Sequence, residues 1–138
     1  MVKVFVAYSR RNGREVRRFV DELESTNPKI EVWYGERNLV PARDIVSEIR
    51  RALSAANALV FCASGATSSG REGDLLAEER RYALHRLGSD PNFKVVSVII
   101  DRHGKVPRGF PEHPTIDLSG RENWRSNVSF VASIILAD

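Results

Sequence analysis

The sequence has little cysteine, no long apolar run and no large excess of charge of either sign. Its one cysteine, Cys62, excludes an internal disulfide, and no cluster of metal ligands accompanies it to suggest a structural zinc site. The surrounding segment ALVFCAS is apolar, which favours a small buried side chain over a nucleophile. No apolar run approaches the roughly 20 residues that span a bilayer, and the N-terminal MVKVFVAYS turns polar too soon for a signal peptide. These absences predict a cytoplasmic protein with no membrane partner and no metal.

The charge balance is nearly even. The 21 basic residues exceed the 18 acidic ones by three, and solubility alone accounts for a net charge of +3, so the sequence does not predict direct nucleic-acid binding. A mixture of 42% hydrophobic and 28% charged residues is typical of a globular chain. The length suits a single domain, 1–138, without internal repeats or a linker.

Short apolar runs alternate with amphipathic segments along the chain. The predicted strands lie at 3–8, 30–34, 58–63, 93–100 and 115–118, and the predicted helices at 14–24, 45–56, 75–87 and 124–136. Asn12 and Asp44 stand where N-caps of the first two helices are expected. The segments GERNLVPAR, SGATSSGREGD and 101–114, which follow the second, third and fourth strands, are predicted to be loops.

The third and fourth predicted strands, ALVFCA and VVSVII, are almost wholly apolar, which indicates a parallel sheet covered on both faces. At this length the pattern predicts an α/β fold, a flavodoxin-like three-layer sandwich with a five-stranded parallel sheet in the order 2-1-3-4-5. Such sheets bind ligands beyond the carboxyl ends of the strands where the order reverses, here between strands one and three. The loop at 9–12 and the connection before residue 75 flank that point.

The helix predicted at 75–87 carries a carboxylate on its apolar side. At about 100° per residue, one side gathers Leu75, Leu76, Tyr82, Ala83 and Leu87. Glu79 falls within this stripe, about 40° from Leu75, and Glu78 at its margin. A buried carboxylate is costly unless it is paired or lines a cleft. The helix alone is equally consistent with a Glu paired to an Arg at the rim of the core, but the neighbouring crevice favours a functional role for Glu79.

The order and spacing of these segments resemble a TIR (Toll/interleukin-1 receptor) domain, of the bacterial NAD-cleaving type, over nearly the full length. VFVAYSRRNGREVRRFVDEL resembles the family's first strand, polar motif and first helix, and IEVWYGERNLVPARDIVSEIRRAL its second strand, BB loop and next helix. NALVFCAS, VVSVIID and TIDLSG complete the likeness. EERRYAL resembles the element with the catalytic glutamate, and the alignment places Glu79 on it. REG at 71–73 is similar to TIR domains of prokaryotic defence systems, including those that work with short Argonautes.

This resemblance implies an NAD+ glycohydrolase that cleaves the nicotinamide–ribose bond when self-associated, in antiphage defence or cell-death signalling. NAD+ would be the substrate, no separate cofactor would be needed, and a sensor domain or partner protein would trigger clustering. Leu39, Pro41 and Arg43 lie in the loop that the family uses for self-association. The chain departs from the usual pattern at Pro41-Ala42, where Pro-Gly is common, and at Leu75, where an aromatic residue often stands.

Several further residues are candidate substrate contacts in such a site. They are Tyr8, Ser9, Arg10, Arg11, Trp33, Ser64 and Leu75. The two arginines suit the phosphates of a dinucleotide, or are simply solvated loop charges. Trp33 would stack on a base, or pack in the core. Ser64, with Ser68 and Ser69, offers hydroxyl groups that caps and turns explain as well.

A non-catalytic TIR scaffold that acts through homotypic contacts is the alternative from another functional class. A phosphoacceptor receiver domain shares the architecture but requires acidic residues at the ends of the first and third strands, where this chain has AYS and CAS. A different nucleoside-processing hydrolase or transferase of similar topology also remains open. The three histidines share no spacing typical of metal ligands.

Overall fold

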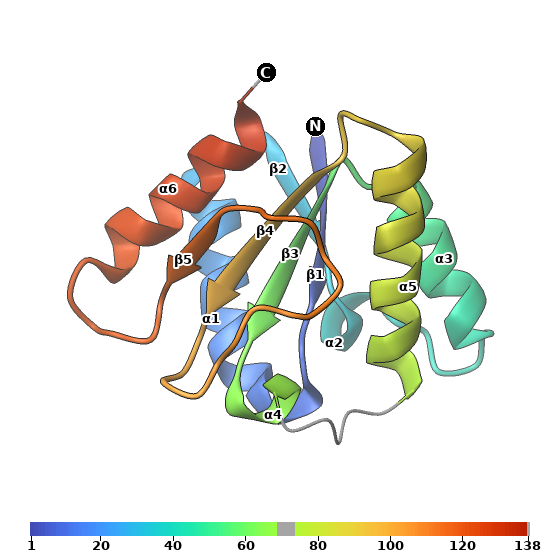
Figure 1. The fold of residues 1–138 in the computed structure, drawn as a ribbon, viewed down its shortest axis with the longest axis horizontal. Coiled ribbons are helices and arrows are strands. Elements are labelled where there is room, and N and C mark those ends of the chain that lie inside the picture. Colours follow the sequence, from blue (N-terminus) through green and yellow to red (C-terminus); the bar gives the residue numbers. More distant parts are fainter. Residues whose placement is uncertain (69–73, 138) are drawn as a thin grey trace.

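The computed structural model describes residues 1–68 and 74–137. Five strands form one sheet: β1 (Val2–Ala7), β2 (Ile30–Trp33), β3 (Ala58–Ala63), β4 (Lys94–Ile99) and β5 (Thr115–Asp117). All neighbours are parallel, and their order is β2-β1-β3-β4-β5, which confirms the predicted fold class and strand order. The carboxyl ends of the strands therefore meet at one edge, at the bottom of Figure 1.

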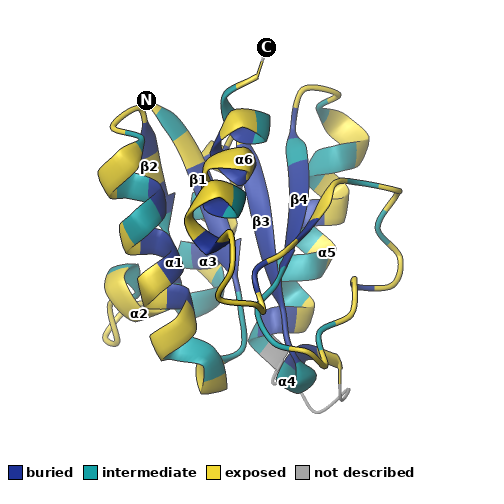
Figure 2. Ribbon diagram, turned by 90° about the vertical axis from the view of Figure 1, so that its left-hand side faces the viewer, coloured by how far each residue is buried: buried dark blue, intermediate teal, exposed yellow. Residues whose placement is uncertain are grey.

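Helices cover both faces of the sheet (Figure 1). On one face α1 (Gly13–Thr26) and α6 (Trp124–Leu136) pack on the even-numbered residues of β1, and on the other α3 (Ile45–Ala55) and α5 (Asp74–Ser89) pack on its odd-numbered residues. Val4 and Phe5, for example, are both buried but belong to opposite cores. This alternation explains why the strands are apolar throughout, and Figure 2 shows them buried beneath partly exposed helices.

The N-cap predictions had different outcomes. Asp44 caps α3, since its Oδ1 accepts hydrogen bonds from Val46 N (3.1 Å) and Ser47 N (3.4 Å). For Asn12 the predicted position was right but the predicted interaction was wrong. Asn12 occupies the N-cap position of α1, but its side chain makes no capping hydrogen bond. A short 3-10 helix, η1 (Arg10–Asn12), precedes α1, and Ser9 caps it instead.

Two short helices replace parts of predicted loops. They are α2 (Gly35–Asn38), in the loop after β2, and α4 (Gly65–Ser68), in the connection after β3. Segments this short have no periodicity from which a helix is predicted. Contacts with distant residues stabilise them: the hydroxyl group of Tyr8 accepts from Glu36 N in α2 (2.8 Å), and the carboxylate of Asp101 accepts from Gly65 N in α4 (2.9 Å).

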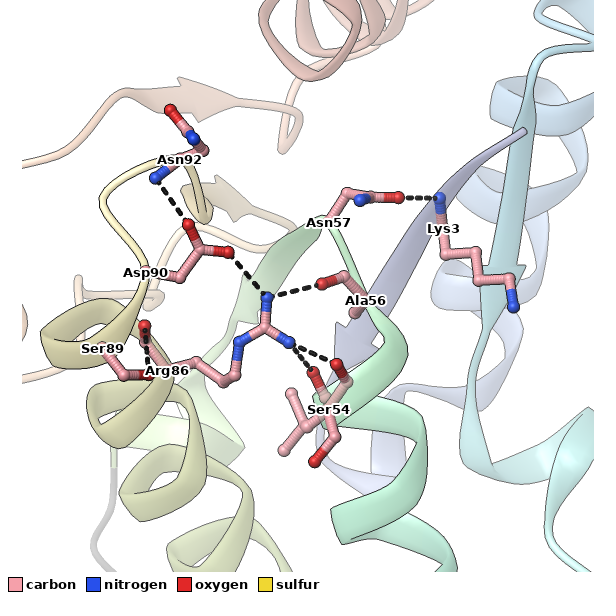
Figure 3. A network of polar contacts seen from close by, with 9 residues as sticks. Lys3, Ser54, Ala56, Asn57, Arg86, Ser89, Asp90 and Asn92 are labelled. Atoms are coloured by element: carbon pink, nitrogen blue, oxygen red, sulfur yellow. Dashed lines mark hydrogen bonds and ion pairs between the residues drawn. The ribbon is translucent and has the colours of Figure 1, made fainter.

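Arg86 of α5 joins the two helices on its face of the sheet (Figure 3). Its guanidinium donates to Leu53 O (3.0 Å) and Ser54 O (2.5 Å) near the C-terminus of α3, and to Ala56 O (3.0 Å) just beyond it. Asp90 accepts a further bond at 3.2 Å, and the guanidinium lies 4.7 Å from the centre of the Phe93 ring. Arg86 thus caps α3 with a positive charge where the helix dipole is negative. Lys94 caps α6 in the same way, through the carbonyls of Ile134, Ile135 and Ala137.

Cys62 is fully buried in β3, as predicted for a small apolar side chain. Burial raises the pKa of its thiol well above the usual range, so the reactive thiolate is rare in the folded protein.

We expect the native protein to react with a thiol reagent at least about 100-fold more slowly than the urea-unfolded protein. Equal rates, measured by thiol-disulfide exchange with a chromogenic disulfide, would contradict this expectation. Among the described residues, no helix combines the length and apolarity needed to cross a bilayer.

Candidate active site at the carboxyl edge of the sheet

The carboxyl ends of β3 and β4 are fastened to each other by the segments that follow them. Besides Gly65 N, the carboxylate of Asp101 accepts a hydrogen bond from His103 N (2.9 Å). The hydroxyl group of Ser68 donates to the carbonyls of Ser64 (2.9 Å) and His103 (3.2 Å). These bonds hold α4 and the loop after β4 as one unit beside the crevice.

Gly104, in the loop after β4, packs closely against the backbone of Ala63 at the end of β3. A Cβ atom built at this position would lie 2.4 Å from the carbonyl oxygen of Ala63, which is backbone and cannot move aside cheaply. We expect Gly104→Ala to lower the free energy of unfolding by about 1–3 kcal/mol, as overpacked sites do. Gly120→Ala is the matched control because nothing lies within 4 Å of its added Cβ. Equal free energies of unfolding for the two variants, measured by urea unfolding, would contradict this account of Gly104.

Glu79 lies on α5 with the buried residues Leu76 and Ala83 of the same face. Its side chain is partly buried, and its Oε2 atom is shielded from solvent. Glu78, one residue earlier, pairs with Arg81 at 2.6 and 2.5 Å, and its side chain is 27% exposed. Both glutamates are partly buried, and Glu79 lies on the side of α5 that carries Leu76 and Ala83.

Tyr8 lies directly after the carboxyl end of β1. Burial raises the pKa of the Tyr8 hydroxyl, and the negative charges of Glu36 and Glu79 raise it further, although the hydrogen bond from Glu36 N lowers it. Among these influences on the Tyr8 pKa, the charge of Glu79 is the smallest. The strand order places the predicted crevice between the carboxyl ends of β1 and β3, next to Tyr8.

The helical turn α2 is clamped to α1 and β2. Glu36 accepts a hydrogen bond from Arg17 of α1 at 2.5 Å. Arg37 donates to both carboxylate oxygens of Glu24 (2.7 and 2.9 Å) and to Val32 O. This hydrogen bonding lowers the pKa of Glu24 and raises that of Arg37. Since Tyr8 also binds α2, the loop after β2 and the crevice share one hydrogen-bonded unit.

The predicted self-association loop begins where this clamp ends. Leu39 is half-buried, whereas Pro41 and Arg43 are exposed, and the side chain of Val40 between them is 40% exposed. Arg43 is only loosely held, with Nη1 3.8 Å from an oxygen of Glu48. The exposed tip, residues 40–43, is therefore an accessible surface next to a rigid turn.

The predicted substrate contacts occupy different environments. Ser9 starts η1, where its hydroxyl oxygen accepts from Arg11 N at 3.4 Å, and the side chains of Arg10 and Arg11 are exposed at the end of β1. Trp33 stacks on Phe5, with ring centroids 4.8 Å apart, and packs with the core beneath α3 and α5. It therefore lies in the core position that was the alternative to base stacking.

Ser64 and Leu75 are also engaged within the protein. Ser64 is fully buried, and its hydroxyl oxygen accepts from Thr67 N at 3.2 Å, so a contact with substrate would require this turn to open. Leu75 is partly buried against the core beneath α3 and α5. Ser69 and the REG segment at 71–73 lie outside the described residues. The substrate roles of all these residues stay predictions.

Sequence reasoning missed two residues that shape the site, Glu36 and Asp101. An acid directly after an apolar strand, as in VVSVIID, is a signal for the second of these. Nothing local signals Glu36, because its partners Tyr8 and Arg17 are 28 and 19 residues away. Within the described residues, no group of three or more His, Cys, Asp or Glu side chains is arranged to hold a metal ion.

Comparisons with known proteins agree with this architecture. A family model described as TIR domain matches residues 4–130. The chain is similar to the SEFIR domain of IL-17 receptor B, at 17% identity and TM-score 0.64 over 97% of this chain and 96% of that chain. It is similar to a prokaryotic SEFIR domain at 13% identity and TM-score 0.66, over 100% of this chain and 94% of that chain. It is also similar to the TIR domains of the activated Roq1 resistosome at 17% identity and TM-score 0.53, over 97% of this chain and 85% of that chain. At these identities the structures show the fold alone, and a search of curated proteins found no significant match.

Proposed function

Because the chain belongs to the TIR-domain family, we propose that it is an NAD+ glycohydrolase in which Glu79 is the catalytic residue. One observation carries the proposal: Glu79 lies on α5 with Leu76 and Ala83, which pack in the core, and its Oε2 atom is shielded from solvent. It lies in the first half of α5, the helix that begins at the carboxyl edge of the sheet, where a sheet of this order binds its ligands. A partly buried acid at such a place is a candidate functional residue.

The chemistry of NAD+ suits a site with one acid. Nicotinamide is a cationic group in NAD+ and leaves as a neutral molecule, so no general acid has to protonate it. Positive charge then develops on the ribose, as in other glycosyl transfers with oxocarbenium-like transition states. A fixed carboxylate stabilises that charge and orients the ribose hydroxyls. Glu79 has this role in the proposal, as orienter and electrostatic stabiliser. Water accepts the ribosyl group and releases a proton when ADP-ribose forms, whereas a nitrogen of the adenine ring of the same molecule accepts it when a cyclic isomer forms.

Cations at the same edge support binding of the rest of the substrate. Arg10 and Arg11 are exposed on η1, directly after the strand that carries Tyr8. Their guanidinium groups match phosphate oxygens in charge and geometry. We assign the pyrophosphate to these two residues, and the nicotinamide ribose to Glu79.

Self-association through the exposed tip at 40–43 is the proposed trigger of activity, with a sensor domain or partner protein bringing copies together. The tip adjoins α2, and α2 is bonded to Tyr8 at the end of β1, so contacts made by the tip act on the carboxyl edge of the sheet through α2. The proposal assigns this consumption of NAD+ on clustering to antiphage defence or cell-death signalling.

The test is NAD+ consumption by the purified protein over a wide range of concentrations, with products identified by mass spectrometry. We expect turnover per protein to rise steeply with concentration, and nicotinamide to appear together with ADP-ribose or a cyclic isomer. Glu79→Ala is expected to remove this activity. A folded Glu79→Ala variant with undiminished turnover would reject the catalytic assignment.

A scaffold that acts by homotypic contacts is the second candidate, and the exposed apolar tip favours it. Val40 and Pro41 are exposed in a loop whose first turn is held rigid. This function predicts that Pro41→Ala combined with Arg43→Glu abolishes self-association, while the clustered wild type leaves NAD+ intact. Concentration-dependent NAD+ loss would exclude it as the sole function.

A further inference from the structure

A groove of about 510 Å³ lies between α1 and α6, on the helix pair away from α5 and its Glu79. Its walls carry four arginines, two acids and an aromatic ring: Arg14, Arg17, Arg18, Arg125, Asp21, Glu22 and Trp124. We propose that this arginine groove binds an acidic segment of a partner protein through Arg14, Arg18 and Arg125. The proposal concerns another face of the molecule and does not depend on the catalytic one.

Arg14 and Arg18 occupy positions on α1 where their positive charges destabilise the helix. Arg14 is in the first turn, where the helix dipole is positive and a cation is unfavourable. Arg14 and Arg18 are four residues apart, so their like charges repel on one face of the helix. Such an arrangement lowers stability, and a bound anion would relieve it.

The guanidinium groups differ in how far they are already engaged. Arg17 is held by Glu36 at 2.5 Å and is therefore left out of the proposed contacts. Arg125 is 86% exposed, and its nearest acid, Glu22, lies at 3.7 Å, beyond hydrogen-bond distance. Arg14 is exposed and makes no ion pair with any residue that the structure describes.

Trp124 orients the third guanidinium. Arg18 lies over the indole ring, 4.1 Å from its centroid, and this cation–π contact fixes the guanidinium plane while its N–H donors stay available. Trp124 itself is largely buried between α1 and α6, with 9% exposed. Arginine and tryptophan together are typical of residues that dominate the binding energy of protein interfaces.

The acids in the groove favour a protein partner over a nucleic acid. Asp21 and Glu22 lie in the same groove as the arginines, so the groove carries charges of both signs. A nucleic-acid strand carries a phosphate on every nucleotide and would meet both acids. Separated carboxylates on a protein segment can instead pair bidentately with the guanidinium groups, without placing a negative charge opposite Asp21 or Glu22.

Fluorescence anisotropy with a labelled peptide of alternating glutamate and serine tests the proposal. We expect Arg14→Glu combined with Arg125→Glu to weaken binding by roughly tenfold or more, through loss of close charge pairs. Arg51→Glu combined with Arg108→Glu is the matched control, because both residues are exposed, lie outside the groove and change the net charge equally. The control variant is expected to bind as the wild type does.

Three results would overturn the proposal: no binding of the peptide by the wild type, equal weakening in both double variants, or tighter binding of an oligothymidylate by the same arginines. The last would assign the groove to nucleic acid. Thermal unfolding separates binding from structure, since Arg14→Glu is expected to raise the Tm by replacing an unfavourable cation with an anion near the helix N-terminus. A lower Tm would show that Arg14 serves the fold instead.

Discussion

Replacing Glu79 with glutamine is expected to reduce NAD+ cleavage by about 100-fold or more, the usual effect of removing one electrostatic contact to the transition state. Glutamine keeps the shape and the hydrogen-bonding oxygen of glutamate but not its charge. The loss should therefore fall on kcat, since the positive charge on the ribose appears only as the bond to nicotinamide breaks. Steady-state NAD+ hydrolysis at a clustering concentration measures it.

Glu78→Gln is the matched control, because it makes the same chemical change one residue away, in a carboxylate that pairs with Arg81 at the surface. It should leave NAD+ cleavage within about twofold of the wild type. Thermal unfolding of both variants shows whether each is folded at the temperature of the assay. Loss of activity in both variants, or in neither, would contradict the assignment of Glu79.

Replacing Arg86 with alanine is expected to lower the free energy of unfolding by about 2–4 kcal/mol. The arginine makes three hydrogen bonds to carbonyls around the C-terminus of α3 and one to Asp90, with only 18% of its side chain exposed (Figure 3). Without the guanidinium, these carbonyls lose their partners and α5 loses its polar link to α3. Urea unfolding followed by circular dichroism gives the change directly.

Two further variants identify the cause. Arg86→Lys keeps the charge but cannot reach several carbonyls with one planar fork, so it should recover less than half of the lost stability. Arg81→Ala removes an arginine that is 67% exposed from the same helix, and should cost about 0.5 kcal/mol or less. An Arg86→Ala variant as stable as Arg81→Ala would show that the cap contributes nothing.

The regular elements follow from the local pattern of apolar residues. The bounds predicted for β3, 58–63, and for α6, 124–136, agree with the structure because each apolar stretch is bordered by polar or turn-forming residues. Helix α5 runs from 74 to 89, slightly beyond its predicted 75–87, since the apolar stripe ends before the helical hydrogen bonds do. The winding of that helix places Glu79 rather than Glu78 on its apolar side, and the choice between the two acids stays a prediction.

The sequence by itself determined the class of fold, because the strands and helices depend on periodicities within single segments, and the order of the strands followed as the common one for that class. Tertiary structure alone decided that Tyr8 holds α2, that Asp101 holds α4 and that Arg86 caps α3. Each of these bonds joins residues at least 28 positions apart, so no local window contains both partners. The arginine groove was likewise invisible in a net charge of +3, since only the packing of α1 on α6 brings Arg125 to the arginines of α1.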